Sequence, residues 1–136
     1  MNAWPQSWIL PMQLRQYLDN FRNSIEKFEV FGLSEKTEIK EEIRPGKQAV
    51  INIHVSLINE TNLYLRAYID ARYKINLISY AFQYQKKNGQ LIFRYDNAAH
   101  KPKLSSKYHK HLSDGDIVET DMPDIAKLVD EIIDSF

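Results

Sequence analysis

Three of the four histidines of this chain fall between residues 100 and 111, where they are interspersed with lysines. The segment contains His100, His109 and His111 together with Lys101, Lys103, Lys107 and Lys110. No acidic residue follows Asp96 until Asp114. Imidazoles exchange protons near neutral pH, and lysines bind phosphates. The residue types in this segment therefore predict chemistry on a phosphate or a nucleic acid.

Ribonucleases that need no metal and use the ribose 2′-hydroxyl require a base, an acid and a cation beside the phosphate. His100, His109 and His111 are the candidate acid–base residues. Arg94 and Asp96 end an apolar run just before this segment. Arg94 could clamp the phosphate, and Asp96 could orient a histidine. The alternatives are a solvated basic loop, an Arg94–Asp96 ion pair without further function, and an Asp96 that only builds a turn.

Lysines, arginines and tyrosines supply the candidates for RNA binding. These candidates are Lys101, Lys107, Lys110, Arg66 and Tyr95. Tyrosines and arginines can stack on and hold single-stranded nucleic acid, and Tyr64, Arg66, Tyr68 and Arg72 share one parity of a strand pattern. Alternatively, that parity simply meets water while the other faces the core. We interpret His54, in an earlier strand pattern, as structural.

His109 and His111 could also share a metal ion, because alternate residues of an extended segment point to the same side. Zinc usually needs a third protein ligand, which could come from His100 or Asp114. The chain has no cysteine, and no spaced ligand motif accompanies the pair. We therefore expect no metal and no other cofactor.

The net charge of zero conceals a strong asymmetry. Residues 97–113 carry four lysines and no acidic residue, whereas residues 114–136 carry eight acidic residues and one lysine. A basic segment beside an acidic tail predicts anion binding at one place rather than over the whole surface. The alternative is that the acidic tail only neutralises the basic segment.

Length and composition predict one domain over residues 1–136. Hydrophobic residues make up 43% and charged residues 26% of the chain, proportions typical of a soluble globular protein. No apolar run approaches the length of about 20 residues that a membrane helix needs, and residues 1–11 lack the basic start of a signal peptide. We therefore expect a cytoplasmic protein that does not enter the membrane.

The periodicity of the apolar residues predicts the elements that position these side chains. Spacings of four and three residues predict an amphipathic helix that begins after Pro11 and ends near Gly32, with the apolar positions Leu14, Leu18, Phe21, Ile25 and Phe28. Residues 34–47 are charged and end in a Pro45-Gly46 turn. Four strands are expected over residues 51–57, 63–71, 75–85 and 91–95, the last two joined by an Asn88-Gly89 hairpin.

A second helix is expected to begin at residues 121–123, with Asp121 as its cap, and to bury an apolar face that runs from Ile125 to Phe136. The expected fold is therefore α+β. It comprises an N-terminal helix, a four-stranded antiparallel meander, a long His/Lys-rich loop and a C-terminal helix, with both helices covering one face of the sheet.

The run Leu91-Ile-Phe-Arg-Tyr-Asp-Asn-Ala-Ala-His100, followed by His109-Lys-His111 and by Leu128-Val-Asp-Glu-Ile132, resembles the TumE family. These small prokaryotic proteins are described as the toxin components of toxin–antitoxin pairs. The resemblance covers about residues 63–135. It departs at Ala99, where the family usually has proline, and at Lys101, where it often has a second histidine.

The resemblance implies a genetic role, that of a toxin with a cognate antitoxin as its partner, rather than a particular reaction. Combined with the residues above, it predicts a toxin-like protein that cleaves RNA without a metal by histidine acid–base chemistry. The alternative is a non-catalytic module that binds nucleic acid or a partner protein. The sequence leaves open both whether the protein is an enzyme and whether it forms a homodimer.

Overall fold

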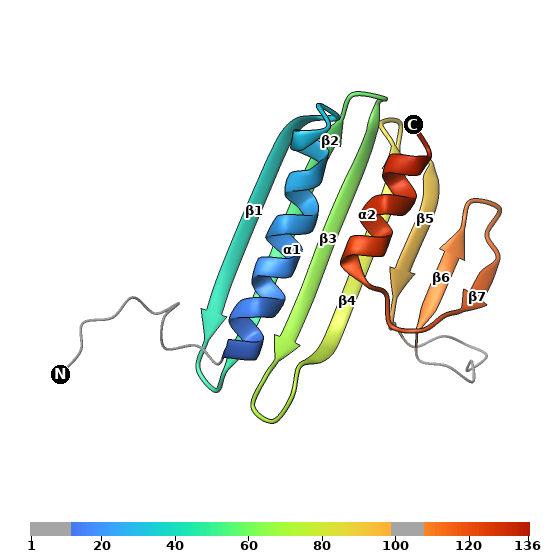
Figure 1. Ribbon diagram of the computed structural model, residues 1–136. Helices are drawn as coiled ribbons and strands as arrows, with labels where there is room; N and C mark the ends of the chain where they lie inside the picture. Colours follow the sequence, from blue (N-terminus) through green and yellow to red (C-terminus); the bar gives the residue numbers. More distant parts are fainter. Residues whose placement is uncertain (1–11, 99–107) are drawn as a thin grey trace.

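An antiparallel sheet of seven strands carries two helices on one of its faces in the computed structural model (Figure 1). The structure describes residues 12–98 and 108–136. The strands lie in the sheet in chain order: β1 (Ser34–Arg44), β2 (Gln48–Leu57), β3 (Thr61–Asp70), β4 (Asn76–Lys86), β5 (Leu91–Asp96), β6 (His109–Leu112) and β7 (Ile117–Glu119). The helices are α1 (Met12–Val30) and α2 (Ile125–Asp134), which lie side by side on the same face (Figure 1).

The core lies between this face of the sheet and the helices. The five apolar positions predicted for the first helix are all buried, as is the apolar stripe of α2 that includes Leu128 and Ile132. Alternate residues of β2 and β3 complete the core, among them Ile51, Ile53 and Leu65. The alternation that predicted these strands therefore also predicts which of their faces is buried. The opposite face of the sheet, which we call the open face, carries no helix of the described residues.

The α+β arrangement of helix, antiparallel sheet and helix is confirmed, but the prediction of four strands is wrong. The charged residues 34–44 form β1, an edge strand whose side chains are all exposed or half-buried. An edge strand without a buried face shows no apolar alternation, so periodicity does not reveal it.

The predicted long loop is also partly wrong, because the segment after residue 107 forms the hairpin β6–β7. Gly115 turns this hairpin with a φ of +93°, a conformation that glycine adopts without a steric penalty. Strand β6 is paired on both sides, with β5 and with β7. Strand pairing depends on cross-strand packing, which a short polar run does not reveal in its own sequence.

The cap of the second helix is Asp124 rather than Asp121. The Asp124 carboxylate accepts hydrogen bonds from the backbone N–H groups of Ala126 and Lys127, as an N-cap side chain does. The helix consequently begins at Ile125, a few residues after its predicted start. No helix among the described residues is long and apolar enough to cross a membrane.

Candidate functional site

The site is built on β5 and β6, which pair antiparallel in a register that places Arg94 opposite His111 and Asp96 opposite His109. Residues directly opposite in a sheet share a face, as do residues two apart in one strand. All four side chains therefore lie on one face. It is the open face, because the intervening Tyr95 and Lys110 contact α2 through Glu131.

The carboxylate of Asp96 is the centre of this group. The Nε of Arg94 donates a hydrogen bond to its Oδ2 at 2.9 Å, and the Nε2 of His111 lies 3.1 Å from the same oxygen. The Nδ1 of His109 lies 3.7 Å from the other oxygen, Oδ1. We call these four residues the Asp96 cluster. One buried carboxylate thus holds an arginine and an imidazole and has a second imidazole beside it.

Asp96 is ionised at neutral pH because of its neighbours. Burial alone would raise the pKa of its carboxyl group, but the interactions with the neighbouring Arg94 and His111 outweigh burial and hold the pKa below its ordinary value. An ionised carboxylate accepts hydrogen bonds and donates none. The negative charge of Asp96 favours the His111 tautomer that has its hydrogen on Nε2, the ring nitrogen 3.1 Å from the carboxylate.

Exposure divides the Asp96 cluster into two layers. The side chains of Asp96 and His109 each expose only 4% of their surface, whereas those of His111 and Arg94 expose 22% and 38%. A ligand on the open face can touch His111 and Arg94 directly. His109 and Asp96 are almost fully buried, so we expect them to act through the residues that a ligand contacts.

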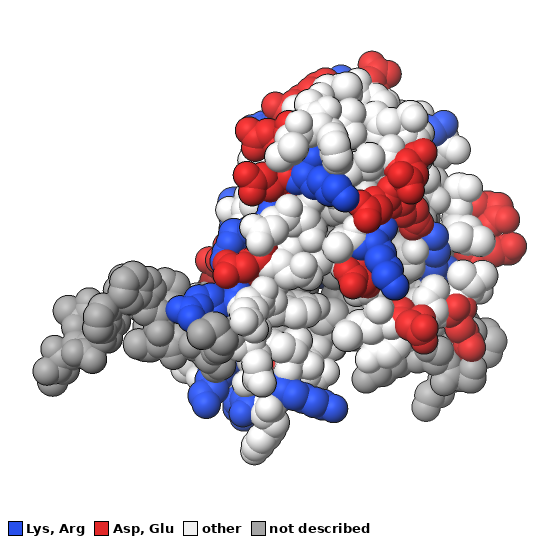
Figure 2. All heavy atoms as spheres, in the orientation of Figure 1, with Lys and Arg blue, Asp and Glu red and all other residues white. Residues whose placement is uncertain are grey.

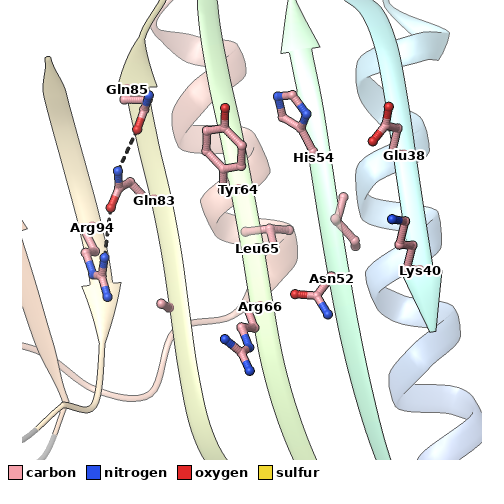
Figure 3. Close-up of a pocket in the computed structure, with 12 residues that line it drawn as sticks. Glu38, Lys40, Asn52, His54, Tyr64, Leu65, Arg66, Gln83, Gln85 and Arg94 are labelled. Carbon is pink, nitrogen blue, oxygen red and sulfur yellow. Dashed lines mark hydrogen bonds between the residues drawn. The ribbon is translucent and has the colours of Figure 1, made fainter. Parts of the chain in front are cut away.

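A hollow of about 540 Å³ adjoins the cluster on the same face and extends from β5 to β1 (Figure 3). Arg94 reaches its edge and donates from Nη1 to the side-chain oxygen of Gln83 at 2.9 Å, and Gln83 donates in turn to Gln85 at 2.6 Å (Figure 3). Arg66 and His54 also line the hollow. The guanidinium of Arg94 is therefore held from two sides, by Asp96 and by Gln83.

The candidate residues from the sequence separate into three sets. Arg94, Asp96, His109 and His111 come together, and Arg66 lies on the same open face along the hollow. Lys110 and Tyr95 lie on the opposite face, where both contact Glu131 of α2 at 3.0 to 3.3 Å. The third set, His100, Lys101 and Lys107, lies outside the described residues.

Lys110 also bears on the charge asymmetry of the chain. Its ammonium group is paired with Glu131 of the acidic C-terminal segment, in agreement with the alternative that this segment neutralises the lysines. Acidic and basic side chains are interspersed on the face that carries the helices (Figure 2). The basic groups that line the hollow lie on the open face, away from α2.

Sequence reasoning undervalued His54 and did not single out Gln83. His54 is stacked on Tyr64, with their ring centres 4.4 Å apart and their planes 8° apart, and it lines the hollow. Its parity in the pattern of residues 51–57 placed it on the polar side of its strand. The sequence therefore shows on which side of the strand His54 lies, but it does not show that His54 meets Tyr64 across the sheet. Among residues 12–98 and 108–136, no group of three or more His, Asp or Glu side chains could hold a metal ion.

Comparison with known proteins agrees with the sequence motifs. No curated protein and no solved structure matches the chain. The model of one family, described as toxin TumE, matches residues 23–135, a range that includes the whole Asp96 cluster, the whole sheet, α2 and the C-terminal part of α1. By this match over most of its length, the chain belongs to the TumE toxin family.

Proposed function

We propose that this toxin cleaves RNA at the Asp96 cluster, with His111 as general base and Arg94 as the cation that binds the phosphate. The observation that carries the proposal is that one buried, ionised carboxylate holds both groups, at 3.1 and 2.9 Å, on the open face of the sheet. A carboxylate that orients an imidazole is a recurring way to prepare a general base. Membership of a toxin family implies a cognate antitoxin, and we expect this partner to cover the cluster.

His111 is suited to remove the proton of a ribose 2′-hydroxyl. Its Nε2 lies 3.1 Å from Asp96 Oδ2, so the negative charge favours the hydrogen on Nε2, Nδ1 accepts the proton, and the carboxylate stabilises the imidazolium that forms. The 2′-oxygen then forms a bond to phosphorus while the bond from phosphorus to the 5′-oxygen breaks. The products carry a 2′,3′-cyclic phosphate and a 5′-hydroxyl end.

Arg94 is suited to bind the phosphate that reacts. Its Nε and Nη1 are hydrogen bonded to Asp96 and Gln83, which fixes the plane of the guanidinium. The other N–H groups of a guanidinium so fixed can donate to the non-bridging phosphate oxygens, where negative charge grows in the transition state. His109, buried beside Asp96, is a positioning residue. The departing 5′-oxygen takes its proton from a second acid, for which His100 is the candidate from the sequence.

The test is cleavage of a single-stranded RNA by the purified toxin in the presence of EDTA. We expect products with 2′,3′-cyclic phosphate ends and a rate that falls about 10²- to 10⁴-fold in His111→Gln. Arg94→Gln should also lose most of the activity. Arg72→Gln is the matched control, because Arg72 also pairs with an aspartate two residues away, Asp70 at 3.2 Å, but does not line the hollow.

Two results would contradict the proposal. Cleavage that stops in EDTA and returns with a divalent metal would replace histidine catalysis by metal catalysis. Full cleavage by the His111→Gln variant would show that His111 is not the general base. RNA binding without cleavage in either condition would instead favour the alternative of a non-catalytic nucleic-acid-binding module.

A further inference from the structure

The hollow beside the Asp96 cluster is lined by an exposed aromatic ring. Tyr64 of β3 exposes 41% of its surface, although it lies in the middle of the sheet. His54 of β2 stacks on the ring of Tyr64 and is hydrogen bonded through Nε2 to Asn62 at 2.9 Å. His54 thus supports one face of the Tyr64 ring. The other face is turned towards β4, over the hollow (Figure 3).

We propose that this hollow is a nucleobase subsite, in which one unpaired base of a single-stranded RNA stacks on Tyr64. The inference rests on the proposed RNA cleavage and specifies the form of its substrate. A tyrosine ring presents a flat apolar surface that any base can cover, and such stacking is the usual means by which proteins hold unpaired bases. A base within a duplex is already covered on both sides by its neighbours and is not available to Tyr64.

The dimensions of the hollow fit one base next to the scissile phosphate. Tyr64 pairs across the sheet with Gln83, and Gln83 pairs with Arg94, so two strand spacings separate Tyr64 from Arg94. This separation is about 10 Å. The side chain of Gln83, which is hydrogen bonded to Arg94, occupies the part nearest Arg94, and a stacked base needs about 3.4 Å beside Tyr64. In the neighbouring row of paired residues, Ala81 lies between Arg66 and Asp96. Its small side chain fills little of the hollow that it lines.

The charges around the hollow favour a polyanion. Lys40 and Arg66 line it and contribute two positive charges, beside Arg94, whose charge is shared with Asp96. Its one lining carboxylate, Glu38, is paired with Lys36 at 2.8 Å, so the negative charge of Glu38 is compensated on β1. Lys40 and Arg66 are both exposed, and Arg66 lies two residues from Tyr64 on the same strand face. These two cations can hold the phosphates that flank a base stacked on Tyr64.

The test measures binding in His111→Gln protein, which keeps the RNA intact. A fluorescently labelled single-stranded oligonucleotide is titrated into this protein and into the same protein with a second substitution. Tyr64→Thr removes the ring but keeps a residue that favours strands. Loss of one stacked base should weaken binding about 5- to 150-fold. Tyr64→Phe keeps the ring and should bind within about twofold of the His111→Gln parent.

Tyr73→Thr is the matched control, because Tyr73 is 92% exposed in the turn between β3 and β4 and does not line the hollow. It should bind as the parent does. Equal losses for Tyr64→Thr and Tyr73→Thr would overturn the inference, as would equal affinity of the parent for a single strand and its duplex. A 2-aminopurine base in the oligonucleotide adds a direct readout of stacking, since its fluorescence should be quenched by the parent and by Tyr64→Phe but not by Tyr64→Thr.

The outcomes separate this inference from the proposed cleavage. A wild-type protein that cleaves nothing, but whose binding depends on Tyr64 as described, would support the base subsite and contradict the catalytic role of His111. A wild-type protein that cleaves RNA at a rate and an affinity independent of Tyr64 would support the catalytic role and overturn the base subsite.

Discussion

The two faces of β5 and β6 carry similar polar residues in opposite roles. On the open face, Arg94 and His111 converge on the buried carboxylate of Asp96 and remain partly exposed. On the helix-bearing face, Lys110 lies 4.9 Å from the ring centres of both Phe93 and Tyr95 and pairs with Glu131. His111 and Lys110, which are neighbours on β6, thus differ in role: His111 belongs to the candidate site, and Lys110 packs α2 against the sheet.

The comparison shows that orientation and partner decide a role more than residue type does. Lys110 keeps its charge because hydrogen bonds with Tyr95 and Glu131 outweigh burial and raise the pKa of its ammonium group. That charge serves to attach α2 to the sheet. The charge of Asp96 is also kept against burial, but it holds two groups that a ligand can touch. The contrast predicts that substitutions on the open face change activity, while those on the helix-bearing face change stability.

The largest effect is expected for Asp96→Asn. Without the negative charge, nothing fixes the hydrogen of His111 on Nε2 or the orientation of Arg94, so RNA cleavage should fall roughly 10²- to 10⁴-fold and growth arrest should be lost. Asp70→Asn is the matched control, because Asp70 also pairs with an arginine two residues away, Arg72. Growth arrest by Asp96→Asn equal to that of Asp70→Asn would remove the cluster from the mechanism.

Lys110→Met tests the other face. It removes the ion pair with Glu131 and the cation beside two aromatic rings, so the free energy of unfolding should fall by about 1–2 kcal/mol in urea denaturation. RNA cleavage should stay within about twofold of the wild type, because Lys110 faces α2. Lys127→Met, at an exposed position on α2, is the control. If Lys110→Met instead lost RNA cleavage while its stability stayed unchanged, Lys110 would act in RNA binding rather than in the attachment of α2.

The sequence predicts the part of the fold that has a buried face. Helix α1 and strands β2 to β5 follow from apolar periodicity and from the Asn88-Gly89 turn, whose Gly89 has a φ of +93°. Strand β1 is missed because both of its faces carry charged residues, such as Lys40 on one face and Glu41 on the other. Strands β6 and β7 are missed because they are short and polar, and because β6 pairs with β5 and β7 pairs with β6 without an apolar alternation that would reveal either strand.

The same limit applies to the site. Residue types single out Arg94, Asp96, His109 and His111, but only the register between β5 and β6 brings them to one carboxylate. That register also places Lys110 and Tyr95 on the other face, which composition alone cannot show. His54 meets Tyr64 through the pairing of β2 with β3. No local pattern in either strand specifies that pairing.

A smaller effect is expected at the N-terminus of α2. The carboxylate of Asp124 accepts a hydrogen bond from the N–H of Ala126 at 2.8 Å, so Asp124→Ala should lower the free energy of unfolding by about 1 kcal/mol. Asp121→Ala removes the same charge three residues earlier and should change stability by less than about 0.5 kcal/mol. Thermal unfolding of both variants distinguishes the two caps. Equal melting temperatures would contradict the cap at Asp124.

The smallest effect is the acid dependence of stability that arises from Asp96. The pKa of this carboxyl group is held below its ordinary value, so the unfolded chain binds protons more readily than the folded one in acid. The stabilisation is complete above the unfolded value of about 3.9 and is lost as the pH falls through the lower folded pKa. It should amount to less than about 1 kcal/mol, since its partner Arg94 is more than one-third exposed and solvent weakens the pair.

Urea denaturation of wild type and Asp96→Asn between pH 6 and pH 2.5 measures this contribution. The difference in unfolding free energy between the two proteins should shrink as the pH falls, because protonation of Asp96 makes the wild type resemble the variant. Asp134→Asn, which removes an exposed carboxylate near the C-terminus, supplies the baseline. A difference that stays constant over this range would mean that Arg94 and His111 do not hold the charge of Asp96, and the open face would lose the feature that distinguishes it from the helix-bearing face.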